Sequence, residues 1–308
     1  MSKQAFYFID DVIWCLRDIT RQKADSVFCN SFFKMLKKAN EDYGMTVQLH
    51  VFYRTDFFYG DDEFTLTEVT DRYKEEFEDN SNWLKFAFHA KQEFPDYPYI
   101  NISYEDAKNN YTAVKNEIIR FAGEKSLSNA VILHWGAMSK AGCRALKDCG
   151  VKFLSPSVGE RYEFNGDDSS LPYGHAARLK QNRQPETMLF TRDTNNKAIT
   201  ASICSYNYIN AEQHNKIIWK NASLYDDGTG LYFKRLADGP CLNLFTLESL
   251  EEKLDELKDY EYVGIANHEQ YFYPDYYAYQ NDYADKTYLA GKILKDNGFT
   301  FITADNMK

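Results

Sequence analysis

Two adjacent carboxylates, Asp10 and Asp11, follow directly on a short apolar run near the N-terminus, Phe6–Ile9. A short run of apolar and aromatic residues predicts a buried strand. Carboxylates at the end of a buried strand repel each other and lose hydration, so they need a cation, a cationic side chain or a shared proton beside them. The alternative is that one aspartate caps a following helix and the other faces solvent. The pair is therefore a candidate site.

Three of the six histidines also lie at the ends of expected strands: His89, His134 and His268. In parallel α/β folds the active site lies at the carboxyl ends of the strands, where such residues meet. One histidine alone is more often structural, but three together with the Asp10–Asp11 pair indicate a shared site. Imidazole nitrogen and carboxylate oxygen suit a divalent metal, and zinc is the one we expect. The other histidines, which we interpret as structural, are His50, His175 and His214.

Strand and helix patterns alternate along most of the chain. Strands are expected at about 5–9, 46–53, 84–88, 130–133, 151–154, 262–266 and 299–303. Helices are expected at 31–43, 65–78, 103–122, 139–149, 246–258 and 285–297, and residues 12–22 form a loop or a short helix. This order predicts an α/β fold in which helices wrap a parallel sheet, either open or closed as a barrel. We expect a single domain over residues 1–308.

The alternation breaks between about residues 156 and 239, where helical periodicity is poor and Asn, Asp, Gly and Tyr are frequent. Strand-like runs occur there at 187–192, 198–205 and 231–235. We interpret this region as a β-rich insertion in the α/β domain rather than an independent domain.

Charge and apolar content limit the partners. The formal net charge is -10, which argues against broad binding to nucleic acid or to an anionic membrane. The sequence has no apolar leader and no run of about 18 apolar residues, so the expected location is the cytoplasm. The six cysteines are scattered without a CxxC pair and are expected to be free thiols. A homo-oligomer is left open.

Several motifs resemble those of NodB-type polysaccharide deacetylases, carbohydrate esterase family 4, in the glycoside hydrolase/deacetylase β/α-barrel superfamily. The segment Phe8–Asp11 is similar to the family's first motif, and His89–Glu93 to its metal-binding motif, with Glu93 at the position of a second histidine. On a helical turn, residues 89 and 93 would share one face. Ile265–His268 is loosely similar to the last motif, and Leu294–Thr303 to the closing segment. The resemblance covers roughly residues 5–155 and 240–305.

This resemblance implies a distorted (β/α) barrel of seven or eight mostly parallel strands that removes the acetyl group from an N-acetylated sugar. It implies that Asp11, His89 and Glu93 hold a divalent metal, that Asp10 is the general base and that His268 is the general acid. A metal lowers the pKa of bound water and polarises the acyl oxygen. A carboxylate then accepts the water proton and an imidazolium protonates the leaving amine.

The family's arginine motif is matched only by position, at His134 and Trp135, so His134 is either a ligand or the partner of the base. His134 and Trp135, together with Tyr271 and Tyr273, are candidates for binding the carbohydrate substrate, because aromatic faces stack on sugar rings. The tyrosines can instead pack a lid.

Two other functions stay open at this point. One is a carbohydrate-binding barrel without catalytic activity. The other is a glycoside hydrolase, which needs a second acid opposite Asp10, for which Glu93 and Glu269 are the candidates.

Overall fold

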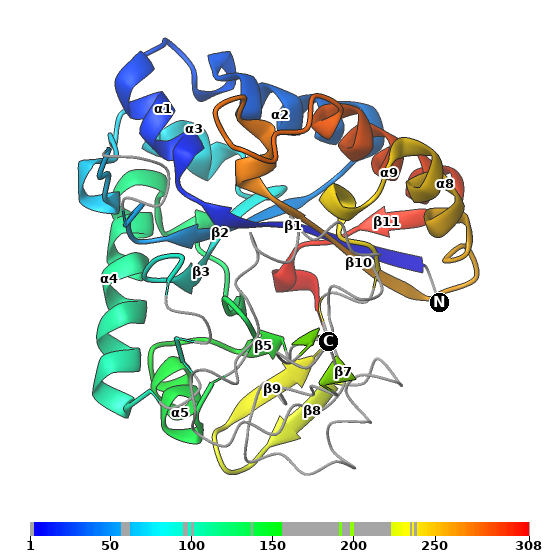
Figure 1. Ribbon diagram of the computed structural model, residues 1–308. Coiled ribbons are helices and arrows are strands. Elements are labelled where there is room, and N and C mark those ends of the chain that lie inside the picture. Colours follow the sequence, from blue (N-terminus) through cyan, green and yellow to red (C-terminus); the bar gives the residue numbers. More distant parts are fainter. Residues whose placement is uncertain are drawn as a thin grey trace.

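A computed structural model gives the fold (Figure 1). It describes residues 3–56, 62–94, 98–99, 102–136, 138–155, 191–192, 198–199, 223–234, 236 and 239–307. Most of the expected insertion, with His175, His214 and Cys204, lies outside these residues, whereas the other five cysteines are free thiols. No helix of the described part is long and apolar enough to cross a bilayer.

The larger sheet has five strands, and all its pairings are parallel. In spatial order its strands are β10 (Tyr262–His268), β1 (Lys3–Val12), β2 (Val47–Phe52) and β3 (Leu84–Ala90), with β11 (Phe299–Phe301) paired to β1. The carboxyl ends of these strands therefore meet at one edge, as the sequence predicted for an α/β fold with a mostly parallel sheet.

A second sheet has the order β4 (Ala130–Ile132), β5 (Phe153–Ser155), β9 (Leu231–Lys234) and β8 (Ser223–Asp226). Only the β8–β9 pairing in it is antiparallel. A short antiparallel pair joins β6 (Thr191–Arg192) to β7 (Ala198–Ile199). Strands β6, β7 and β9 fall in the three strand-like runs expected there, whereas β8 was not expected.

Backbone hydrogen bonds join β3 and β10 to segments that flank the strands of the second sheet. Next to β3, the N–H of Ser128 donates to the carbonyl of Phe86 at 2.8 Å. Next to β10, the N–H of Ala266 donates to the carbonyl of Pro240 at 3.1 Å. The strands thus curve around a shared interior, which is the arrangement of a distorted barrel.

Helices pack on the outside of the strands. Figure 1 shows α1, α2, α8 and α9 along the face of β1 and β10, and the long α4 beside β3. Among the described residues, the helices are α1 (Trp14–Gln22), α2 (Ser31–Tyr43), α3 (Lys74–Asp79), α4 (Tyr104–Ala122), α5 (Lys140–Asp148), α8 (Leu247–Asp255) and α9 (Tyr283–Asp296). Single 3-10 turns are η1 (Val27–Cys29), η2 (Leu66–Glu68), η3 (Glu124–Ser126), η6 (Leu242–Leu244), η7 (Glu269–Phe272) and η8 (Ala304–Asn306).

Strand β1 is buried on both faces, so its residues divide between two apolar clusters. Tyr7 and Ile9 belong to the large core shared with the helices. Phe6 and Phe8 belong to a smaller cluster inside the barrel, which includes Phe153 of the second sheet. This period of two predicts that the next even-numbered residue of β1 faces the interior.

The prediction of one continuous helix over residues 65–78 is wrong. Thr65 does form a capping box with Glu68, but the segment makes only the turn η2 before α3 begins at Lys74. Arg120 of α4 donates to the carbonyls of Leu66 and Val69, each at 2.8 Å. These carbonyls would accept from backbone N–H groups in a continuous helix, so the tertiary contact replaces another helical turn.

Candidate metal centre

The two aspartates of β1 face the same interior because the strand is irregular between them. Neighbouring residues of a regular strand face opposite sides of a sheet, but the register with β2 shifts between Ile9 and Val12. Asp11 takes a left-handed conformation with φ 62°, which aspartate tolerates better than most residues. Asp10 and Asp11 are 9 % and 3 % exposed, so both carboxylates are buried at the carboxyl edge of the sheet.

Asp11 lies against two histidines from neighbouring strands. Its Oδ1 is 3.1 Å from Nε2 of His89, at the end of β3, and 3.4 Å from Nδ1 of His134, just after β4. These two ring nitrogens are 3.3 Å apart. One carboxylate oxygen and two imidazole nitrogens therefore converge on one small volume, as a metal site requires.

In each histidine ring, the contact of the nitrogen that faces away from Asp11 shows which nitrogen carries the hydrogen. Nδ1 of His89 is 2.8 Å from the carbonyl oxygen of Ile132. Nε2 of His134 is 2.9 Å from the carbonyl oxygen of Glu93. Carbonyl oxygens only accept, so these nitrogens carry the hydrogens and the inner nitrogens of the neutral rings carry lone pairs. Three acceptors therefore face one another.

Burial and mutual contacts shift the pKa values of these three residues. Burial opposes ionisation of Asp11, but the adjacent side chains of His134 and His89 hold its pKa well below the usual value. Burial lowers the pKa of His134. Burial also acts to lower the pKa of His89, but the nearby carboxylates Asp10 and Asp11 raise it overall. Oδ1 of Asp11 has no hydrogen-bond donor among the described residues.

The remaining contacts hold this group in place. Nε2 of Gln270 donates to Oδ2 of Asp11 at 2.8 Å, which leaves Oδ1 directed at the two histidines. Each histidine is oriented by a backbone carbonyl, the usual outer contact of a metal-binding imidazole. We call Asp11, His89 and His134 the DHH group. Its two nitrogens and one oxygen match the donors that zinc binds.

Glu93 lies outside the DHH group. The helical turn expected over 89–93 is wrong, because β3 continues to Ala90 and the chain then bends. As a result, Oε1 of Glu93 is 3.9 Å from Nε2 of His134, on the side of that ring away from Asp11. The structure thus places His134, and not Glu93, beside Asp11 and His89.

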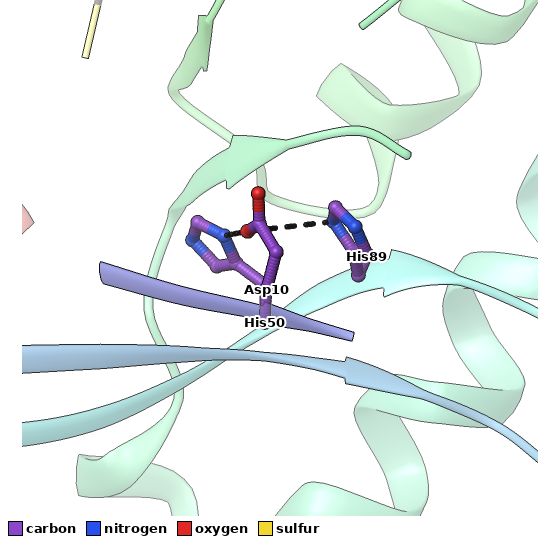
Figure 2. A group of neighbouring side chains, drawn as sticks. All are labelled: Asp10, His50 and His89. Carbon is purple, nitrogen blue, oxygen red and sulfur yellow. Dashed lines mark hydrogen bonds and ion pairs between the residues drawn. The ribbon is translucent and has the colours of Figure 1, made fainter. Parts of the chain in front are cut away.

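Asp10 is held by His50 of β2, which sequence reasoning treated as structural. Figure 2 shows Asp10 between His50 and His89: its Oδ1 is 2.5 Å from Nδ1 of His50 and 3.8 Å from Nδ1 of His89. Burial raises the pKa of Asp10, but His89 and His50 lower it overall. Gln48 and His50 on one face of an apolar strand were the signal that could have identified this contact.

His268 lies beside Asp10, since the two residues are register partners in the parallel pairing of β1 and β10. Its Nδ1 is 3.0 Å from the amide oxygen of Asn243 and 3.4 Å from the sulfur of Cys241. An amide oxygen only accepts, so Nδ1 carries a hydrogen. His268 therefore joins Asp10 and the DHH group at the carboxyl edge of the sheet.

The aromatic candidates occupy different environments. Trp135 is half-buried, and its ring centroid is 5.9 Å from that of His134. Tyr271 is 3 % exposed, and its ring centroid is 6.2 Å from that of His268. Tyr273 is 8 % exposed and packs edge-on against Trp14 at 5.0 Å. Of these candidates, Trp135 offers the most accessible ring.

Glu269 caps helix α1. Its two carboxylate oxygens accept the N–H groups of Ile13, Trp14 and Cys15 at 2.7, 2.8 and 2.7 Å. Burial raises the pKa of Glu269 to about 6, although these donors lower it. Because both oxygens are engaged by the helix N-terminus, this contact explains the position of Glu269 without a catalytic role.

Comparisons with known proteins concern the fold. No protein-family model matches the sequence, and a search of curated proteins found no match. Among solved structures, the chain is similar to the 4-alpha-glucanotransferase from Thermococcus litoralis, with a TM-score of 0.52, 11% identity and coverage of 99% of this chain and 40% of that chain. The Xyl-CE4 domain of a multidomain xylanase from the hindgut metagenome of Trinervitermes trinervoides gives a TM-score of 0.39 at 11% identity, covering 99% and 89%. A protein designated a polysaccharide deacetylase, from Mycobacterium smegmatis, gives 0.44 at 10% identity, also covering 99% and 89%.

The fold and site together define a class of protein. The chain is an α/β barrel-like protein with a buried Asp–His–His group at the carboxyl edge of its parallel sheet. A second carboxylate, Asp10, lies next to that group.

Proposed function

We propose that this protein is a metal-dependent deacetylase that acts on an N-acylated sugar or glycan. The convergence of three acceptor atoms, Oδ1 of Asp11, Nε2 of His89 and Nδ1 of His134, carries the proposal. Such a group is stable only when a cation or a proton lies between its members. The motif resemblance at residues 8–11 and 265–268 adds support for the reaction class.

The DHH group would hold the metal, and its nitrogen and oxygen donors favour zinc. When bound, such an ion lowers the pKa of a coordinated water and polarises the acyl oxygen. The remaining roles belong to residues of the chain. Asp10 accepts a proton from the attacking water, and His268 donates a proton to the leaving amine nitrogen. Trp135 stacks on the sugar ring.

Metal content and acetate release test this proposal together. We expect one zinc ion per chain by elemental analysis, and acetate release from N-acetylglucosamine oligomers. Asp11→Ala and His134→Ala should each lose the metal. Asp10→Asn should keep the metal and lose turnover.

Glu93→Gln is the matched control, because Glu93 contacts His134 from outside the DHH group, so this variant should retain zinc. The proposal is lost if the purified protein binds no divalent metal at micromolar concentration. If zinc binds and a glycan changes the tryptophan fluorescence without acetate release, the protein is a carbohydrate-binding barrel instead.

A further inference from the structure

A chain of buried polar side chains leads from Asp10 across the barrel interior. Oδ1 of Asp10 is 2.5 Å from Nδ1 of His50, and Nε2 of His50 is 2.6 Å from Nε2 of Gln48. The same Gln48 nitrogen donates to the carbonyl of Ala130 on β4 at 3.0 Å. His50 and Gln48 are 0 % and 2 % exposed, so these contacts are shielded from water. We call Gln48 and His50 the QH pair.

The contact with Ala130 determines the protonation of the QH pair. A carbonyl oxygen only accepts, so the side-chain atom of Gln48 facing Ala130 must be the NH2 group and not the amide oxygen. The second hydrogen of this NH2 group then points to Nε2 of His50, which must accept it. His50 is consequently the neutral tautomer with its hydrogen on Nδ1, and it donates this hydrogen to Asp10.

The position of the hydrogen on His50 distinguishes the QH pair from the DHH group as a possible metal site. Asp10, His50 and His89 also lie close enough to form a metal group. However, the nitrogens facing Asp10 are Nδ1 of His50 and Nδ1 of His89, and both carry hydrogens, the latter because it donates to Ile132. A metal needs lone pairs, so this second group does not offer the donors that an ion requires.

We propose that Gln48 and His50 are positioning residues for the base, which fix the carboxylate of Asp10 through a neutral N–H donor and do not bind the metal. This inference rests on the proposed function only for the role of Asp10 as base. His50 holds one carboxylate oxygen of Asp10, and Gln48 keeps the His50 hydrogen on Nδ1. A neutral donor orients the carboxylate without placing a second cation beside the metal.

Three substitutions at His50 test the role of the donor. His50→Phe keeps a planar ring but removes the N–H, so we expect kcat to fall about 10- to 100-fold, the range for lost supporting contacts at metal sites. KM and zinc content should stay unchanged. His50→Asn places an amide NH2 near the position of Nδ1 and should recover most of kcat. His50→Gln carries the same amide one methylene further out and should not.

The tautomer gives a readout independent of activity. In the zinc-loaded wild type, nitrogen NMR should show His50 with its hydrogen on Nδ1, identified by the signal missing in His50→Asn. Gln48→Leu removes the donor to Nε2 and should yield a mixture of tautomers, with a smaller loss of kcat than His50→Phe.

Three results would overturn the proposal: a hydrogen on Nε2 of His50 in the wild type, loss of zinc in His50→Phe or His50→Asn, or full activity in His50→Phe. If the wild type releases no acetate from N-acetylglucosamine oligomers, the proposed function fails by itself. The tautomer of His50 and the zinc content of the His50 variants then still decide whether the QH pair holds Asp10 without binding the metal.

Discussion

Replacing Asp11 by asparagine keeps the shape of this side chain in the DHH group but turns one hydrogen-bond acceptor into a donor. The asparagine oxygen can keep the contact with Gln270, because that contact is made at the Oδ2 position. The NH2 group then occupies the position of Oδ1, 3.1 Å from Nε2 of His89 and 3.4 Å from Nδ1 of His134. Asparagine also tolerates the left-handed backbone at this residue. A donor thus replaces the acceptor between two lone pairs.

The expected change in stability follows from these contacts. A buried acceptor without a donor costs about 1–3 kcal/mol, and a new neutral hydrogen bond contributes about 1 kcal/mol. Metal-free Asp11→Asn should therefore be about 2–4 kcal/mol more stable toward unfolding than the metal-free wild type. Zinc at 100 times its dissociation constant stabilises the wild type by about 2.7 kcal/mol, and it should leave the variant unchanged.

Urea unfolding at pH 8, first with a chelator and then with zinc, measures both effects. The variant should be the more stable protein without metal, and its advantage should disappear in zinc. Asp285→Asn, an exposed carboxylate in the first turn of α9, controls for the loss of one negative charge and should lower stability by at most about 1 kcal/mol. If metal-free Asp11→Asn is less stable than metal-free wild type, a proton and not a set of facing lone pairs occupies the site, and our assignment of the tautomers is refuted.

Three further predictions concern the surroundings of the site. Gln270→Leu removes the donor to Oδ2 of Asp11, so zinc affinity should fall about 10- to 100-fold in a chelator competition; an unchanged affinity would contradict the role of this contact. Glu269→Gln sets an NH2 group against backbone N–H groups of α1 and should lower the free energy of unfolding at pH 7 by about 2–4 kcal/mol. Since the folded pKa of Glu269 is raised to about 6 from an ordinary 4.5, its favourable contribution is full below about pH 4.5 and is lost as the pH rises through 6. The wild-type advantage over Glu269→Gln in urea unfolding should thus shrink by about 2 kcal/mol between pH 4.5 and 7; a growing advantage would show the opposite shift. Ser103→Ala removes the cap of α4, where Oγ accepts from the N–H of Asp106 at 3.1 Å, and should cost about 1 kcal/mol in urea unfolding, whereas Ser103→Thr should retain most of it.

The sequence was most informative where local rules determine structure. The parallel α/β arrangement follows from the alternation of strand and helix patterns, and the helix expected over residues 103–122 forms with Ser103 as its cap. The helix after Thr65 was predicted wrongly because the competing contact comes from Arg120, more than 50 residues away. Distant donors of this kind leave no local pattern in the segment that they alter.

The candidate site was also only partly accessible to sequence reasoning. Their positions at strand ends predicted that Asp11, His89 and His134 share one site, because parallel strands present their carboxyl ends at one edge. The placement of Glu93 failed, since the i to i+4 rule holds only in a helix and the chain bends there instead. His50 was interpreted as a structural residue because it lies within a strand. The period of two in a strand, however, places it on the same face as Gln48.

The irregular backbone at Asp11 lets the proposed base and a proposed metal ligand face the same interior although they are consecutive residues of one strand. Their Cα atoms are joined by a single peptide unit, a fixed span of about 3.8 Å. Thermal movement of β3 or β4 can shift either histidine, but it cannot separate the two carboxylates at the backbone. The spacing between the proposed proton acceptor and the proposed metal ligand is thus set largely by covalent bonds.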